Sequence, residues 1–125
     1  MQGNAIFNNC SNLKTVHFSY IANMSSSMFM NCTSLTNLTF IDKSISCNLY
    51  FNSSPVITEE SCLNIINALA DNAKVTVQLH SVVKNHMAND WYCKKENGKY
   101  VSCTAEDEGA IKQTAALIAR GGTLA

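Results

Sequence analysis

The sequence predicts a single α/β domain, in which a solenoid of short parallel strands is closed by a larger C-terminal cap. Three observations lead to this prediction: a twelve-residue phrase that occurs twice, a strand–helix–strand pattern after it, and a hairpin signal near the C-terminus. The 125 residues can enclose one hydrophobic core, and their apolar content of 46% is ordinary for a globular protein. We expect repeats over residues 1–48 and the cap over residues 49–125.

The repeated phrase is FNNCSNLKTVHF, beginning at Phe7, and FMNCTSLTNLTF, beginning 22 residues later at Phe29. Apolar positions align with apolar positions in the two copies. A fixed period in the low twenties is typical of a solenoid, in which each unit covers the apolar face of its neighbour. Alternation within the first copy predicts a strand with Leu13, Val16 and Phe18 in the core.

An Asn-Cys pair precedes each expected strand, at Asn9-Cys10 and Asn31-Cys32. We expect these pairs to form a buried ladder that satisfies backbone groups at the bend, with both cysteines reduced in the core. The alternate strand positions should face outward and build a flat polar surface suited to a protein partner. Its members are Thr15, His17, Asn37 and Thr39.

The cap begins with a strand at 48–51, a helix at 61–70 and a strand at 74–79. Thr58 is the expected N-cap, and the two glutamates that follow it suit the positive end of the helix dipole. Strand, helix and strand within about thirty residues predict a βαβ crossover that continues a parallel sheet. A final helix is expected over 105–119, with Thr104 as its cap, followed by a short strand.

The segment WYCKKENGKYVSC, residues 91–103, predicts a β-hairpin inserted into the cap, with Asn97-Gly98 at its turn. Two registers are open. A two-residue turn places Cys93 opposite Ser102, whereas a three-residue bulged turn places Cys93 opposite Cys103 and permits a disulfide.

Aromatic and basic side chains gather on this hairpin, which suggests a protein-binding surface, since interface hot spots favour such residues. The alternative is that the aromatic residues simply cover the end of the core. The candidate binding residues are Trp91, Tyr92, Lys94, Lys95 and Tyr100.

The composition argues against several functions. Nine basic and nine acidic residues cancel without a basic cluster, so we expect no nucleic-acid partner. No apolar run is long enough for a membrane span, and the first residues lack the pattern of a secretory signal, so we expect neither in these 125 residues. Histidine and cysteine spacings match no metal site, no glycine-rich phosphate loop occurs, and no catalytic constellation appears. We therefore expect no enzyme activity, no catalytic residues, no metal and no cofactor.

The two phrases resemble the A-F-x-x-C-x-x-L-x-x-[IVL]-x-[IF] repeat of BspA-like leucine-rich repeat proteins. Residues 53–71 look like the helical unit that often closes such arrays. The closing IARGGTLA resembles the family's terminal K-G-W-T-[LV]-A signature, with Arg120 for lysine and Gly122 for tryptophan. The resemblance implies a leucine-rich-repeat solenoid, and the missing tryptophan suggests that the terminal strand packs less tightly than in relatives.

The resemblance also implies a function: non-catalytic protein binding or adhesion, in a protein that is secreted or displayed on the cell surface. Two repeats without an N-terminal cap suggest the C-terminal end of a longer array. An alternative is a purely structural cap with no ligand of its own. A further hypothesis is a homodimer formed through the open repeat edge at residues 5–18, because unpaired strand edges associate readily.

Overall fold

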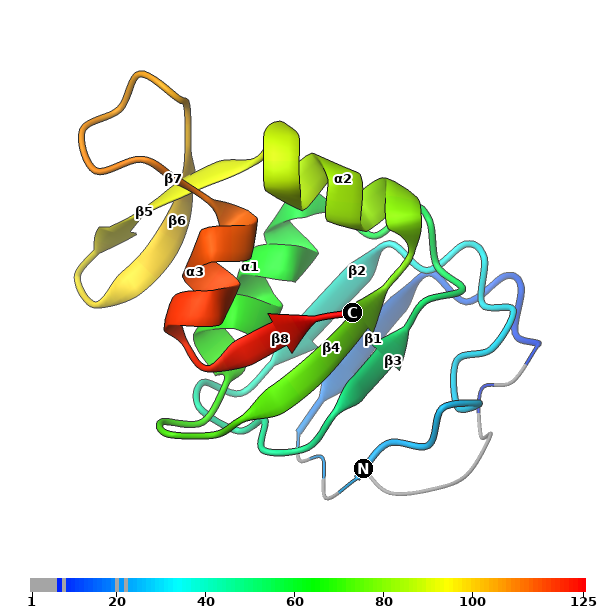
Figure 1. The fold of residues 1–125 in the computed structure, drawn as a ribbon. Coiled ribbons are helices and arrows are strands. Elements are labelled where there is room, and N and C mark those ends of the chain that lie inside the picture. Colours follow the sequence, from blue (N-terminus) through cyan, green and yellow to red (C-terminus); the bar gives the residue numbers. More distant parts are fainter. Residues whose placement is uncertain (1–6, 8, 20, 22) are drawn as a thin grey trace.

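The computed structural model describes residue 7, residues 9–19, residue 21 and residues 23–125. The chain has a mixed α/β fold with small parallel and antiparallel sheets (Figure 1). The parallel strands are β1 (Thr15–Phe18) with β2 (Asn37–Phe40), and β3 (Leu49–Phe51), β4 (Val75–Leu79) and β8 (Gly122–Leu124). The antiparallel sheet contains β5 (Tyr92–Glu96), β6 (Lys99–Cys103) and β7 (Ile111–Lys112). The helices are α1 (Glu59–Ala68), α2 (Ser81–Asn89) and α3 (Gln113–Ala119).

The two copies of the phrase form adjacent parallel strands. Val16 of β1 pairs with Leu38 of β2, a register offset of 22 residues, which is the sequence period. The same offset stacks the aromatic rings: Phe7 lies on Phe29 with centroids 5.3 Å apart, and Phe18 lies on Phe40 at 4.9 Å. The predicted strands and their inward-facing Val16 and Phe18 are therefore confirmed, and Leu13 packs at the edge of the same core.

The Asn-Cys pairs do not form the predicted buried ladder, because only the cysteine side of each pair enters the core. Asn9 and Asn31 are exposed, and both adopt a left-handed backbone with φ of 63°. Asn31 Nδ2 donates a hydrogen bond to Asn9 Oδ1 over 2.6 Å. Cys32 is buried, and its thiol donates to the Phe7 carbonyl, while Cys10 is half-buried. Asparagine is favoured at these positions because it tolerates positive φ. Since both asparagines are exposed, their hydrogen bond lies on the surface of the bend.

A third period follows that the sequence analysis missed. Phe51 lies one period after Phe29, with ring centroids 5.2 Å apart. Ser54 occupies the position of Cys32 and donates its hydroxyl to the Cys32 carbonyl over 2.8 Å. Serine replaces cysteine, and a helix begins where a strand would start, so the third copy has no recognisable phrase. The signals in the sequence were the spacing of Phe51 and the positions of Ile57 and Thr58, which lie 22 residues after Leu35 and Thr36.

Helix α1 covers the outer edge of β2 with side chains in place of a third strand. The Leu38 amide donates to Ser61 Oγ, and that hydroxyl donates to the Thr36 carbonyl, each over 2.9 Å. Asn64 Nδ2 donates to the Leu38 carbonyl over 2.8 Å. Backbone groups that a neighbouring strand would satisfy are thus satisfied by the helix, and the β1–β2 ladder stops here.

The predicted strand–helix–strand unit is confirmed, because β3 and β4 are parallel neighbours with α1 between them in the chain. It does not continue the sheet of the repeated phrase, since β3 and β4 belong to a sheet separate from β1 and β2. Thr58 caps α1 as expected: the Ser61 amide donates to Thr58 Oγ1. Strand β8 joins the other edge of β4 and confirms the short last strand.

Two parts of the cap differ from the prediction. Helix α2 lies in a segment that carried no clear helical signal, and His80 rather than a serine or threonine caps it. The final helix spans only Gln113–Ala119 instead of 105–119. Thr104 does not cap it, because its amide donates to Asp107 Oδ2 within a tight turn. Residues 111–112 pair with β5 as strand β7, so the helix begins only at Gln113.

Gly122 stands where the resembling signature has tryptophan, and it is buried rather than loosely packed. A Cβ placed on Gly122 would lie 2.8 Å from Leu117 Cγ. Leu117, which is fully buried, therefore fills the space beside the terminal strand. The terminal strand is therefore closely packed at Gly122.

Candidate functional surfaces

The exposed face of β1 and β2 carries the predicted polar set. Thr15 pairs with Asn37, and His17 pairs with Thr39, so all four side chains project from one face. His17 Nδ1 and Thr39 Oγ1 lie 2.7 Å apart and are hydrogen-bonded. A small hollow of about 130 Å³ lies beside Asn37 and Thr39 where α1 meets β2, and Glu60 also lines it. The face offers hydrogen-bond donors and acceptors along a regular strand spacing.

The hairpin forms at the predicted place, but its five candidate binding residues do not share one surface. Tyr92 and Lys94 lie on one face of β5, whereas Lys95 and Tyr100 lie on the other. Tyr100 is 8% exposed, and Lys95 Nζ lies over its ring at 5.5 Å from the centroid. Trp91 precedes β5, is half-buried, and stacks on His86 with centroids 4.8 Å apart.

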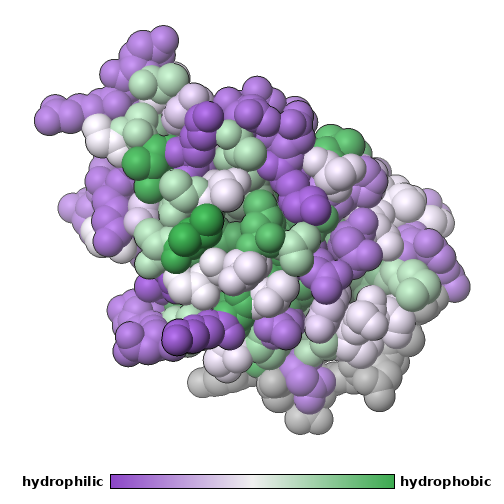
Figure 2. Space-filling view, viewed as in Figure 1, coloured by the Kyte–Doolittle hydropathy of each residue, from purple (hydrophilic) through white to green (hydrophobic). Residues whose placement is uncertain are grey.

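These positions correct the prediction of a single aromatic and basic binding surface. Tyr100 and Trp91 pack against the body of the protein, as the alternative interpretation proposed for the aromatic residues. The hairpin itself projects from the rest of the fold at the upper left of Figure 1. Figure 2 shows this projection covered mostly by hydrophilic residues, while apolar residues reach the surface over α3. Ile118 of α3 is one such residue and is 60% exposed.

The candidate disulfide between Cys93 and Cys103 is absent. Asn97 and Gly98 both have positive φ, 52° and 81°, and form the two-residue turn. Cys93 therefore pairs with Ser102, and Cys103 pairs with Tyr92. Because successive side chains alternate across a strand, the two sulfurs are directed to opposite faces, and both cysteines are free.

The cysteines near α1 are buried, and their pKa values are raised. Burial raises the pKa of the Cys62 thiol to about 12. Burial, together with the nearby Cys103, raises the pKa of Cys93 to about 11. A thiolate is the nucleophilic form of cysteine, and these environments disfavour it.

A polar cavity of about 440 Å³ lies between the hairpin turn and the loops that flank α1. It could not be predicted from local sequence patterns, because its residues come from four separated parts of the chain. Its walls contain Asp42, Lys43, Asn67, Asp71, Lys95, Asn97, Gly98, Lys99, Tyr100 and Arg120.

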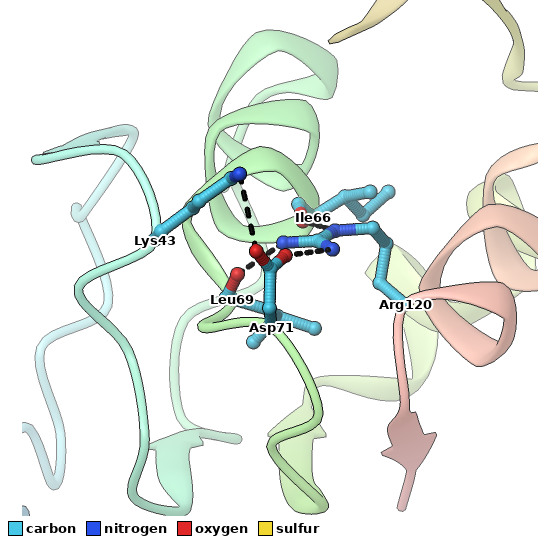
Figure 3. Close-up of polar contacts among 5 residues, drawn as sticks. All are labelled: Lys43, Ile66, Leu69, Asp71 and Arg120. Atoms are coloured by element: carbon cyan, nitrogen blue, oxygen red, sulfur yellow. Dashed lines mark hydrogen bonds and ion pairs between the residues drawn. The ribbon is translucent and has the colours of Figure 1, made fainter. Parts of the chain in front are cut away.

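Asp71 is the centre of one wall (Figure 3). Lys43 Nζ lies 3.1 Å from Asp71 Oδ2, and Arg120 Nη1 lies 3.2 Å from Asp71 Oδ1. Hydrogen bonds from Lys43 and Arg120 lower the pKa of the Asp71 carboxyl. Arg120 also donates from Nε to the Ile66 carbonyl over 3.2 Å and from Nη2 to the Leu69 carbonyl. Arg120 is thus fixed against the end of α1 and holds Asp71 in place.

The hairpin supplies the opposite wall. Lys99 Nζ lies 2.6 Å from Asp42 Oδ2. Asn67 of α1 anchors the hairpin by accepting from the Tyr100 amide and donating to the Tyr100 carbonyl, each over 2.9 Å. Lys95 has no carboxylate partner among the described residues and lies against the Tyr100 ring. The cavity therefore combines four cationic side chains with two carboxylates.

Among the described residues, no group of three or more histidine, cysteine, aspartate or glutamate side chains is arranged to hold a metal ion. No helix within the described part of the chain has the length and hydrophobicity to cross a membrane. Comparisons with family models, with curated proteins and with solved structures found no match to this chain.

Proposed function

We propose that this chain is a non-catalytic protein-binding module, built as part of a BspA-like leucine-rich-repeat solenoid that functions in adhesion at a cell surface or outside the cell. The 22-residue offset between β1 and β2, and the third period at Phe51 and Ser54, support the solenoid assignment. Each unit covers the apolar face of the next, as repeat architectures require.

The observation that carries the binding proposal is the exposed polar face of β1 and β2. Its side chains come from strands, whose backbone is held by the ladder, so a partner meets a preformed surface and little entropy is lost on binding. Thr15 and Asn37 form one row and His17 and Thr39 the next. Short uncharged side chains on a flat sheet suit contact with a protein through hydrogen bonds.

The test is a binding assay against a panel of purified extracellular-matrix proteins and whole epithelial cells. The variant combines His17→Glu with Asn37→Glu, which places two charges on the face without touching the core. A matched control combines Ser81→Glu with Asn85→Glu, which adds the same two charges at exposed positions of α2. We expect binding that the strand-face variant reduces at least tenfold and the α2 control leaves unchanged. Equal binding by both variants would refute the assignment of this face.

A structural cap is the second candidate function, and the contacts of α1 favour it. Ser61 and Asn64 satisfy the open edge of β2, so the helix ends the ladder. If sealing the array were the whole role, the purified chain would bind no member of the panel. Joining it to an isolated repeat array would then raise the midpoint of that array's thermal unfolding.

A further inference from the structure

The cavity between the hairpin turn and α1 is built as a ligand site. Its volume of about 440 Å³ lies within the range of small-molecule pockets, roughly 300–1,000 Å³. Anchors on both walls hold it open: Asn67 fixes the backbone of Tyr100, and Arg120 fixes Asp71 against the end of α1. Neither wall depends on the polar strand face, so the site is independent of the proposed protein-binding surface.

The cavity is cationic although the chain as a whole carries no net charge. Lys43, Lys95, Lys99 and Arg120 face Asp42 and Asp71, which leaves two positive charges in excess. The Lys95 ammonium has no carboxylate partner in the described part of the chain and rests on the Tyr100 ring. An anionic group that enters the cavity can therefore pair with the Lys95 ammonium without breaking an existing ion pair.

The carboxylates of Asp42 and Asp71 restrict which anions can bind in the cavity. Asp42 and Asp71 accept hydrogen bonds and repel further negative charge, so a densely acidic peptide is disfavoured. A saccharide that carries a carboxylate is complementary to both the positive and the negative groups of the cavity. Its carboxylate can pair with the lysines, and its hydroxyls can donate hydrogen bonds to the aspartates. We propose that this cavity binds a carboxylate-bearing saccharide, such as a uronic or sialic acid unit within a glycan.

A neighbouring hollow extends the site. It has a volume of about 580 Å³, shares Asp71 and Arg120 with the cavity, and adds Lys74. Two adjoining hollows with a common charged wall can hold consecutive sugar units. Lys99 and Lys43 are more than half exposed and can turn toward such a ligand, whereas Arg120 is fixed.

The experiment is isothermal titration calorimetry with three probes: trigalacturonic acid, a hyaluronan hexasaccharide and 3′-sialyllactose. The variant is Lys95→Gln combined with Lys99→Gln, at side chains whose loss leaves the core intact. The control, Lys84→Gln combined with Lys112→Gln, removes the same charge from residues outside the cavity. Circular dichroism verifies that both variants are folded. The methyl ester of trigalacturonic acid and a polyglutamate peptide serve as ligand controls.

We expect at least one acidic saccharide to bind, and the double variant to bind it about tenfold more weakly, because a charge-assisted hydrogen bond is lost. The control variant should bind as the unmodified chain does, and the methyl ester should bind weakly or not at all. Failure of all three saccharides at millimolar concentration would overturn the proposal. So would equal binding of the ester, unchanged binding by the double variant, or binding of polyglutamate alone.

Discussion

Asn31 donates a hydrogen bond to Asn9 over 2.6 Å, and the two residues share the same left-handed backbone one 22-residue period apart. The bond joins two bends that have the same conformation. It shows that the repeat is stabilised at its turns as well as in its strands. The two contributions, backbone conformation and side-chain hydrogen bond, can be separated by substitution.

Asn31→Ala should destabilise the chain by about 1–3 kcal/mol, because alanine pays for the left-handed conformation and loses the hydrogen bond to Asn9. Asn31→Gly should cost less, since glycine adopts positive φ without a steric penalty. Urea unfolding followed by circular dichroism measures both. If the glycine variant is no more stable than the alanine variant, backbone strain is not the reason for asparagine at this position.

Ser61→Ala should cost more than an ordinary helix substitution, about 1–3 kcal/mol, although alanine favours helix. The hydroxyl is buried and serves both the Leu38 amide and the Thr36 carbonyl, which would lose their partner. Ser81→Ala at the start of α2, where no side-chain hydrogen bond is formed by Ser81, is the matched control. Similar unfolding free energies for the two variants would argue against the role of α1 in closing the β2 edge.

Acidification should destabilise the chain partly through Asp71. Its pKa is lowered in the folded state, so its stabilising effect is present above the pKa of the unfolded state and is lost as the pH falls through the lower, folded value. Asp71→Asn should therefore reduce stability at pH 7, and the difference from the unmodified chain should shrink in strong acid. The thermal midpoint measured from pH 7 to pH 2 tests this, and a difference independent of pH would contradict it.

Iodoacetamide should modify all six cysteines after unfolding without a reducing agent, because the structure contains no disulfide among them. In the folded chain Cys32, Cys62 and Cys93 should react slowest, since all three are buried and have raised pKa values. Half-buried Cys103 should react faster. Mass spectrometry after timed quenching identifies each site, and a Cys93–Cys103 linked peptide would show that the hairpin takes the bulged register instead.

Self-association through the repeat edge remains a separate prediction. Within the described residues β1 pairs only with β2, and part of the predicted edge at 5–18 lies outside those residues. We expect the apparent mass to fall on hundredfold dilution in light scattering, and Val16→Asp to abolish either the dimer or the fold. A constant monomer mass at every concentration would exclude this association.

The local elements whose signals are short-range could be predicted from the sequence. The repeated phrase fixed the strand spacing and the outward set at Thr15 and His17, and the Thr58 cap with its glutamates marked the start of α1. Asn97-Gly98 placed the hairpin. In each case a backbone preference or an alternation of apolar residues acts within a few positions, so the sequence pattern and the structure agree.

Tertiary structure alone decided the features that depend on distant partners. The contact between the rings of Phe51 and Phe29 forms only in the folded chain, and Tyr100 is buried where Asn67 holds its backbone against α1. The cavity joins Asp42, Asp71, the hairpin turn and Arg120, which no local spacing connects. Helices and strands follow from short-range physics, whereas a site made of separated residues exists only once the chain has packed.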